Sequence, residues 1–151
     1  MKVSPSPNGN HFAHILMVDD HAAGLRARRA ILEQLGYRVA VANGAEEALK
    51  EFAKETFDMV VTDFKMPKVN GVQLIERLRK LNSAIPIILL SGFADVLGLT
   101  EAGTGADLVL AKDSREVEHL IRGVARLLRP KLVKKPPTAA RPASKAKASS
   151  Q

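Results

Sequence analysis

The stretch "ILMVDDHAAG", residues 15–24, places four apolar residues directly before the adjacent aspartates Asp19 and Asp20. A short apolar run of this kind is typical of a buried strand, and a helical pattern begins just after it. Two like charges at the edge of an apolar core repel each other, so the pair must hold a proton or recruit a cation. The stretch therefore predicts a strand, a helix and a charged site where the two join.

Short apolar runs rich in β-branched residues alternate with helical patterns along the chain. The runs span His14–Val18, Arg38–Ala42, Met59–Thr62, Ile87–Leu90 and Leu108–Ala111. Such alternation predicts an α/β fold in which helices cover both faces of a five-stranded parallel sheet. The expected strand order is 2-1-3-4-5. In this order the direction of winding reverses between the first and third strands, and ligands bind in the crevice at that point.

Periodic apolar stripes predict the helices between these strands. The clear ones span Ala22–Leu35, Ala45–Lys54, Gly71–Leu81 and a last helix that ends at Leu128. Asn43 is suited to cap the second helix, and Asp113 with Glu116 resembles a capping box for the last. Residues 93–107 contain three glycines, which disfavour a helix, so we expect the helix there to be short or mobile.

The chain has 151 residues, of which 46% are apolar, enough for the core of one ordinary domain. We expect a flexible N-terminal segment over residues 1–12 and a folded domain over residues 13–128. Residues 129–151 are rich in Pro, Ala, Lys and Ser and have too little apolar surface to fold. They are predicted to form a disordered basic tail.

The formal net charge of +7 is concentrated in this tail. Seven basic residues and no acidic residue lie in residues 129–151, so residues 1–128 hold 16 of each. Any attraction to polyanions is therefore expected of the tail and not of the folded domain. The chain lacks cysteine, and its N-terminal residues include no long apolar run. We expect no disulfide, no signal peptide, no transmembrane segment and a cytoplasmic protein.

Polar residues follow four of the five predicted strands at the point where each strand ends. Asp19 and Asp20 follow the first strand, Asp63 the third, Ser91 the fourth and Lys112 the fifth. Because the carboxyl ends of parallel strands share one edge of a sheet, these side chains are expected to lie together. Three carboxylates tolerate one another when they hold a divalent hard cation, and an all-oxygen ligand set favours Mg²⁺.

Each of these residues also has a structural interpretation when it is taken singly. Asp19 or Asp20 would serve as the N-cap of the first helix, and Asp63 begins a segment rich in turn formers. Ser91 before a glycine is ordinary loop chemistry, and Lys112 would be a solvated charge. Their joint placement at the ends of the expected strands favours the metal site.

Four motifs, in this order and spacing, carry a resemblance to a known family. They are "MVDD" at residues 17–20, "VVTDFKMPKVNG" at residues 60–71, "IILLSG" at residues 87–92 and "LVLAK" at residues 108–112. Over about residues 12–128 the chain resembles a response-regulator receiver domain of two-component signalling. The resemblance is to the stand-alone type, which has a single domain and no attached output domain.

This resemblance implies a role for each residue at the strand ends. Asp63 would accept a phosphoryl group from a sensor histidine kinase or a histidine phosphotransfer protein. Asp20, Asp63 and the backbone carbonyl of Lys65 would bind Mg²⁺, with Asp19 acting directly or through a water molecule.

Lys112 would pair with the phosphoryl oxygens, and the hydroxyl of Ser91 would donate a hydrogen bond to one of them. The resemblance implies a phosphoacceptor that signals by protein–protein interaction to an output protein, and not an enzyme acting on other substrates.

The sequence departs from the family pattern at three positions. Val109 stands where an aromatic residue is usual, so the aromatic rotation that normally reports phosphorylation is not available. Asp113 stands where proline usually follows Lys112, and its carboxylate either competes for that lysine or caps the last helix. The side chain of Lys65, two residues after Asp63, can overhang the phosphorylation site.

Two other functions are left open. Val109, Asp113 and the glycine-rich segment 93–107 favour a binding module that works without phosphorylation. Independently, the seven basic residues of the tail would tether the domain to nucleic acid or another polyanion, or the tail would only keep the protein in solution.

Overall fold

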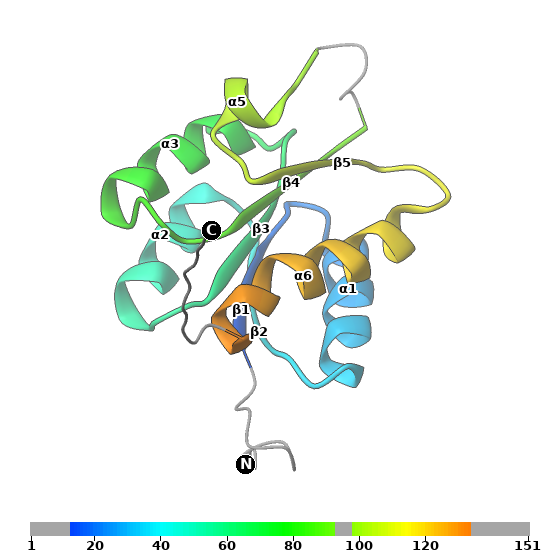
Figure 1. Ribbon diagram of the computed structural model, residues 1–151. Coiled ribbons are helices and arrows are strands. Elements are labelled where there is room, and N and C mark those ends of the chain that lie inside the picture. Colours follow the sequence, from blue (N-terminus) through cyan, green and yellow to red (C-terminus); the bar gives the residue numbers. More distant parts are fainter. Residues whose placement is uncertain (1–12, 93–97, 134–151) are drawn as a thin grey trace, which may run out of the picture.

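The computed structural model of the chain describes residues 13–92 and 98–133 (Figure 1). The predicted flexible segment 1–12 and residues 134–151 of the predicted tail lie outside the described residues. The elements in chain order are β1 (His14–Val18), α1 (Ala22–Gln34), β2 (Arg38–Ala42), α2 (Ala45–Lys54), β3 (Met59–Asp63), α3 (Gly71–Leu81), β4 (Ile87–Ser91), α5 (Glu101–Thr104), β5 (Leu108–Ala111) and α6 (Glu116–Val133).

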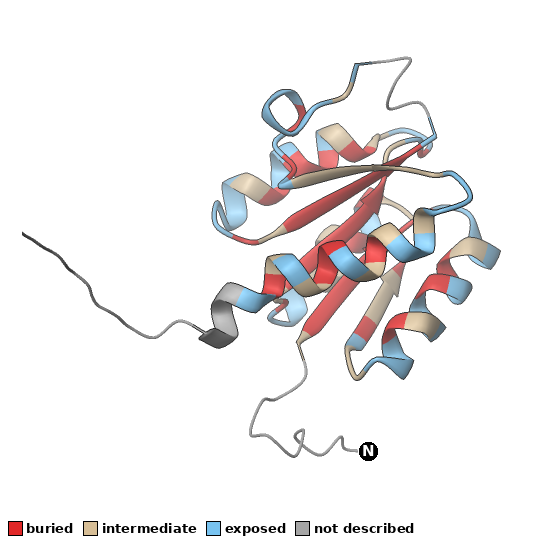
Figure 2. Ribbon diagram, turned by 45° about the vertical axis from the view of Figure 1, so that its right-hand side comes forward, coloured by how far each residue is buried: buried red, intermediate tan, exposed pale blue. Residues whose placement is uncertain are grey.

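The five strands form one parallel sheet in the order β2-β1-β3-β4-β5, which confirms the predicted topology. One apolar cluster joins α1 and α6 to one face of the sheet, and a second joins α2 and α3 to the other. Every residue of β1, β3 and β4 is buried, as Figure 2 shows in red. A strand buried on both faces requires an unbroken apolar run, which is why the sequence shows these strands clearly.

The helix starts differ from the sequence predictions at two places. The N-cap of α1 is His21, whose Nδ1 accepts a hydrogen bond from the backbone N–H of Gly24 at 3.3 Å. The N-cap position of α2 is Gly44, so the prediction that Asn43 caps this helix is wrong. The helix begins one residue too late for the side chain of Asn43, whose backbone N–H instead donates to Oε1 of Glu47 at 2.8 Å.

The start of α6 also corrects a prediction. Asp113 lies three residues before the helix, where its Oδ1 accepts from the backbone N–H of Arg115 at 2.9 Å. The carboxylate of Glu116 does not complete a capping box, because it is hydrogen-bonded to Arg28.

The end of α6 lies at Val133, past the domain end expected at Leu128. This extension includes Pro130, which has no backbone N–H and removes one helical hydrogen bond without ending the helix. Residues 129–133 therefore continue the helix rather than starting the tail.

The loop between β3 and α3 folds back tightly on the end of β3. The backbone N–H of Gly71 donates to the carbonyl of Phe64 at 2.8 Å. A Cβ at position 71 would lie 2.3 Å from the carbonyl oxygen of Asp63, so no side chain fits there. Lys68 within this loop has a positive φ of 69°. The glycine at the end of the "DFKMPKVNG" motif therefore lets the loop close beside Asp63.

Between β4 and β5, the structure describes one short helix. α5 spans only Glu101–Thr104 and ends at Gly105, which has a left-handed φ of 85°. The expectation of a short helix in this segment is confirmed, while residues 93–97 lie outside the described residues. Within the described part of the chain, no helix is long and apolar enough to cross a membrane.

Candidate functional site

The structure brings the predicted site residues together in one cleft of about 600 Å³ at the carboxyl edge of the sheet. The cleft is lined by Asp19, Asp20, His21, Asp63, Lys65, Met66, Pro67, Ser91, Gly92 and Lys112. Asp63 and Ser91 are the last residues of β3 and β4, one position further into the strands than predicted. Both are buried, as is Asp19, whereas Asp20 is exposed. The cleft lies where the strand order reverses, between β1 and β3.

Three carboxylates meet in this cleft and are called the acidic cluster below. Asp19, Asp20 and Asp63 each offer one oxygen, and these oxygens lie within 4.8 Å of one another. A donor set made only of carboxylate oxygens suits a hard divalent cation that retains several waters, as Mg²⁺ does. Lys65, whose backbone carbonyl was expected to join the metal ligands, lines the same cleft.

Asp63 is paired with the lysine predicted from the sequence. Nζ of Lys112 lies 2.5 Å from Oδ1 of Asp63. Burial raises the pKa of Asp63 above its ordinary value of 3.8, and the charge of Asp19 raises it further. The hydrogen bond from Lys112 and the charge of Arg28 oppose this rise without cancelling it. The negative charge on Asp63 is therefore costly in this cleft, and an added cation would stabilise it.

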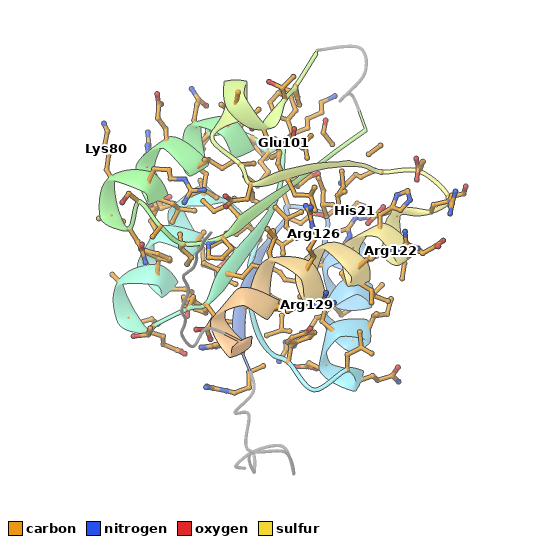
Figure 3. The ribbon with its side chains drawn as sticks, viewed as in Figure 1. His21, Lys80, Glu101, Arg122, Arg126 and Arg129 are labelled. Atoms are coloured by element: carbon orange, nitrogen blue, oxygen red, sulfur yellow. The ribbon has the colours of Figure 1, made fainter. Side chains whose placement is uncertain are left out.

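Asp19 is held by protein donors on both of its oxygens. Oδ1 accepts from the backbone N–H of His21 at 2.9 Å, and Oδ2 accepts from Nη1 of Arg28 at 2.8 Å. Nζ of Lys112 lies further away, 3.7 Å from Oδ2. Asp19 therefore does not cap α1, although it fixes the cap residue His21 by binding its backbone. Figure 3 labels His21 at the junction of β1 and α1.

Arg28 contacts the acidic cluster, although its position was not predicted from the sequence. It lies on the buried face of α1 together with Leu25 and Leu32. Its spacing could have indicated this position: Arg28 lies three residues after Leu25 and four before Leu32, so it falls inside the apolar stripe of the helix. Burial opposes the charge of Arg28, but hydrogen bonds and attraction from Glu116 and Asp19 raise its pKa.

Two of the departures from the family pattern also have defined surroundings. The backbone N–H of Val109, in the edge strand β5, donates to Oε2 of Glu101 at 2.9 Å. Lys112 forms its ion pairs with Asp63 and Asp19. Asp113 contacts the backbone at Arg115, in the turn that precedes α6.

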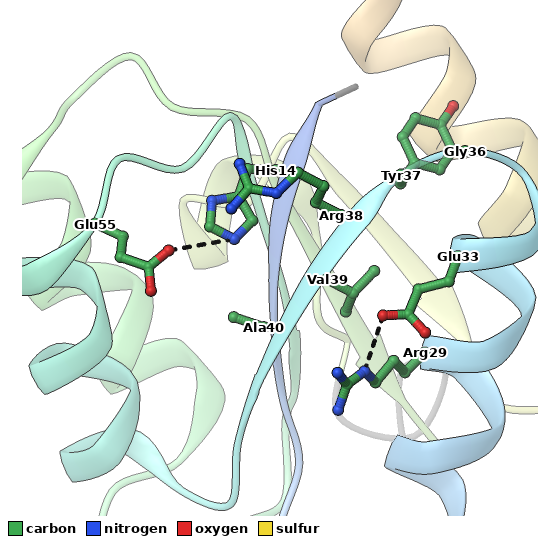
Figure 4. Close-up of a pocket in the computed structure, with 9 residues that line it drawn as sticks. All are labelled: His14, Arg29, Glu33, Gly36, Tyr37, Arg38, Val39, Ala40 and Glu55. Carbon is green, nitrogen blue, oxygen red and sulfur yellow. Dashed lines mark hydrogen bonds and ion pairs between the residues drawn. The ribbon is translucent and has the colours of Figure 1, made fainter. Parts of the chain in front are cut away.

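A second cavity, of about 640 Å³, lies at the opposite edge of the sheet (Figure 4). There Nε2 of His14 lies 3.5 Å from Oε1 of Glu55, and its Nδ1 lies 3.1 Å from the carbonyl of Thr56. Arg29 and Glu33 form a further ion pair at 3.1 Å. His14 thus links the start of β1 to the end of α2, which is a structural role.

Comparison with known proteins identifies the family and the fold. The family model for the response regulator receiver domain matches residues 15–124 of this chain. The chain therefore belongs to this family, and it is a receiver domain of the two-component response-regulator type. Receiver domains are signalling domains that bind Mg²⁺ at a cluster of aspartates.

Among curated relatives, a probable transcriptional regulator ycf27 of Cyanidium caldarium is 36% identical over 127 residues, which is 82% of this chain and 51% of that protein. The transcriptional regulatory protein ZraR of Escherichia coli K12 is 34% identical over 93 residues, or 61% of this chain and 21% of that protein. The chain thus spans about half the length, or less, of these relatives.

Among solved structures, a CheY-like receiver domain protein from Methanospirillum hungatei has a TM-score of 0.73 and 30% identity. The match covers 80% of this chain and 97% of that one. The response regulator TrrA from Thermotoga maritima, solved in complex with Mg²⁺ and BeF, has a TM-score of 0.70 and 29% identity. That match covers 78% of this chain and the whole of the other.

Proposed function

We propose that this chain accepts a phosphoryl group on Asp63 from a sensor histidine kinase or a histidine phosphotransfer protein, with Mg²⁺ bound at the acidic cluster. The observation that carries this proposal is the buried Asp63 at the end of β3, 2.5 Å from Nζ of Lys112 and next to two further carboxylates. The structure of TrrA supports it, because that related protein was solved in complex with Mg²⁺ and BeF.

The transfer uses a carboxylate as the nucleophile. An oxygen of Asp63 forms a bond to phosphorus while the bond between phosphorus and the imidazole nitrogen of the donor breaks, and the imidazole keeps the bonding electrons. Asp20, Asp63 and the carbonyl of Lys65 would hold the Mg²⁺, which when bound neutralises charge on the phosphoryl oxygens. Asp19 would act on the metal directly or through water.

Lys112 and Ser91 supply the remaining contacts to the phosphoryl group. Lys112 already neutralises Asp63, and its ammonium would pair with a phosphoryl oxygen after transfer. Ser91, buried at the end of β4, would donate its hydroxyl to another of these oxygens. Lys65 lines the cleft, and its positive charge would attract an anionic donor. The phosphorylated domain then signals by binding an output protein.

The test is phosphorylation of the full chain by a small acyl phosphate donor in the presence of Mg²⁺. Asp63→Asn removes one nucleophilic oxygen and little volume, so it should abolish base-labile phosphate incorporation, a loss of more than about 100-fold relative to the wild type. Asp113→Asn is the matched control, because it changes an exposed aspartate next to Lys112 and should keep full incorporation. Undiminished labelling of Asp63→Asn would refute the assignment of the acceptor.

A binding module that works without phosphorylation is the second candidate. It is favoured by Val109, which replaces the usual aromatic residue and whose backbone N–H is held by Glu101. In the same experiment, a wild-type chain that binds Mg²⁺ and takes up no phosphate from any donor would favour this function.

A further inference from the structure

Arg28 joins the acidic cluster to the start of α6. Its Nη1 donates to Oδ2 of Asp19 at 2.8 Å, and its Nε donates to Oε2 of Glu116. The side chain of Arg28 is 10% exposed, and those of Asp19 and Glu116 are 3% and 17% exposed. One guanidinium therefore links three elements, β1, α1 and α6, where water screens charges weakly.

The sequence makes room for this guanidinium one turn earlier on α1. A Cβ at Gly24 would lie 3.2 Å from Nη1 and 3.6 Å from Nη2 of Arg28. Side chains on a helix lean toward its N-terminus, so Arg28 reaches back over the turn that contains Gly24. A larger residue at position 24 would press on the guanidinium, so the glycine and the arginine work as a pair.

The position of Arg28 bears directly on cation binding by the acidic cluster. Asp19 supplies one of the three carboxylates, and Arg28 already neutralises it. A divalent cation must compete with this guanidinium for Asp19, and it is also repelled by it. Glu116 acts in the opposite sense, because it shares the positive charge of Arg28.

We propose that Arg28 is a built-in counter-cation of the acidic cluster that weakens its affinity for Mg²⁺, and that Glu116 limits this effect by sharing the guanidinium. Arg28 is then a positioning residue for Asp19. Because Glu116 is the first residue of α6, the metal site and the start of this helix are coupled through one side chain. The inference rests on the magnesium site proposed above.

The experiment measures Mg²⁺ affinity of the full chain by following amide chemical shifts at fixed pH and ionic strength. Arg28→Met keeps an unbranched apolar stem on the buried face of α1 and removes the charge. This variant should bind Mg²⁺ more tightly, on the order of tenfold. Glu116→Gln leaves Arg28 uncompensated and should weaken binding by about threefold to tenfold.

Two controls separate this role from a general effect of charge. Arg29→Met removes the same charge at the next position of α1, where the side chain is 46% exposed, and should leave the affinity within about twofold. Glu118→Gln is the control for Glu116→Gln. It removes a negative charge from α6 at a side chain that is 50% exposed, and it should also leave the Mg²⁺ affinity within about twofold. In the Arg28→Met background, Glu116→Gln should lose most of its effect, because Glu116 acts through Arg28.

Arg28→Met and Glu116→Gln should shift the Mg²⁺ affinity in opposite directions. A merely structural role of this ion pair would not produce opposite shifts. Equal affinities of wild type, Arg28→Met and Arg29→Met would overturn the role of Arg28 while leaving the magnesium site intact. Should Arg28→Met fail to fold, an unchanged affinity in Glu116→Gln overturns it equally. If neither the wild type nor Arg28→Met binds Mg²⁺, the magnesium site itself fails, and the inference fails with it.

Discussion

The ends of β1 and β3 each hold a buried aspartate, yet the surroundings of these two side chains differ. Asp19, 2% exposed, accepts hydrogen bonds from a backbone N–H and from the guanidinium of Arg28. Asp63, 5% exposed, pairs with Lys112 and keeps a pKa raised by its burial. Depth of burial is therefore not what separates the two residues. The donors around each carboxylate decide whether its charge is already satisfied or still costly.

This difference matches the two roles assigned to the strand ends. A carboxylate whose charge is costly gains most when a cation or a phosphoryl transfer changes its state, which suits the acceptor role proposed for Asp63. A carboxylate already held by two donors gains little and is suited to fix its neighbours. Asp19 orients the cap of α1 through His21 and the bridge to α6 through Arg28.

The largest expected effect tests this contrast through stability. Asp19→Asn leaves Arg28 buried with a weakened partner, which should lower the free energy of unfolding by about 2 kcal/mol or more. Asp63→Asn removes a charge that burial makes costly, so it should raise the free energy of unfolding. At about 4 °C per kcal/mol, the two Tm values measured without metal at neutral pH should move in opposite directions. Shifts of the same sign would remove the distinction between the strand ends.

The pH dependence of the same pair sharpens the test. Because the pKa of Asp63 is raised in the folded state, the wild-type penalty is complete above that pKa. As the pH falls through it, the folded protein takes up a proton that the unfolded chain still lacks, so the penalty shrinks. The advantage of Asp63→Asn should therefore decrease on acidification and vanish below the ordinary value of 3.8. An advantage that grows on acidification would contradict the raised pKa.

The position of the site could be predicted from the sequence, and the reason lies in the sheet. Buried parallel strands are continuous apolar runs, and their carboxyl ends meet at one edge, so the residues that follow them converge. The order of the apolar runs is therefore enough to bring Asp19, Asp63 and Lys112 to the same edge. The glycine that closes the loop beside Asp63 is visible in the sequence as well, within a motif of fixed spacing.

The remaining features depend on side-chain paths that spacing does not specify. Arg28 reaches Asp19 and Glu116, which lie 9 and 88 residues away in the sequence. The capping box predicted at Glu116 is wrong for the same reason: its carboxylate binds Arg28, a partner too distant in the sequence to be foreseen. The cap of α1 required a choice among three adjacent polar residues, and His21 filled it because Asp19 turns back to bind its backbone.

The exposed member of the acidic cluster allows a further test. Asp20 lies beside Asp19 at the end of β1 but is exposed, so in the proposed metal site its charge would contribute to cation binding at little cost to the fold. Asp20→Ala should lower Mg²⁺ affinity about tenfold or more, while the Tm without metal stays level or rises. Calorimetric titration and thermal unfolding in a chelator measure the two quantities. A clear loss of metal-free stability would assign Asp20 to the fold.

The smallest effect on the fold is expected far from both strand ends. Arg122, Arg126 and Arg129 are exposed on α6, at a spacing that places them along one side of the helix (Figure 3). The sequence after Val133 adds five basic residues and no acidic one. Deletion of residues 134–151 should change neither the Tm by more than about 1 °C nor the phosphorylation of Asp63, because this sequence offers little apolar surface for packing.

The same deletion tests whether the basic residues bind polyanions. If they do, the full chain should bind anionic vesicles or nucleic acid at low salt, and an increase from about 50 to 200 mM salt should weaken binding by orders of magnitude. The truncated chain should then bind far more weakly. Arg126→Gln in the full chain tells whether α6 extends the basic surface, with a modest further loss expected. Equal binding by the full and truncated chains would place the contact on residues 1–133, where the 16 basic and 16 acidic residues before position 129 cancel.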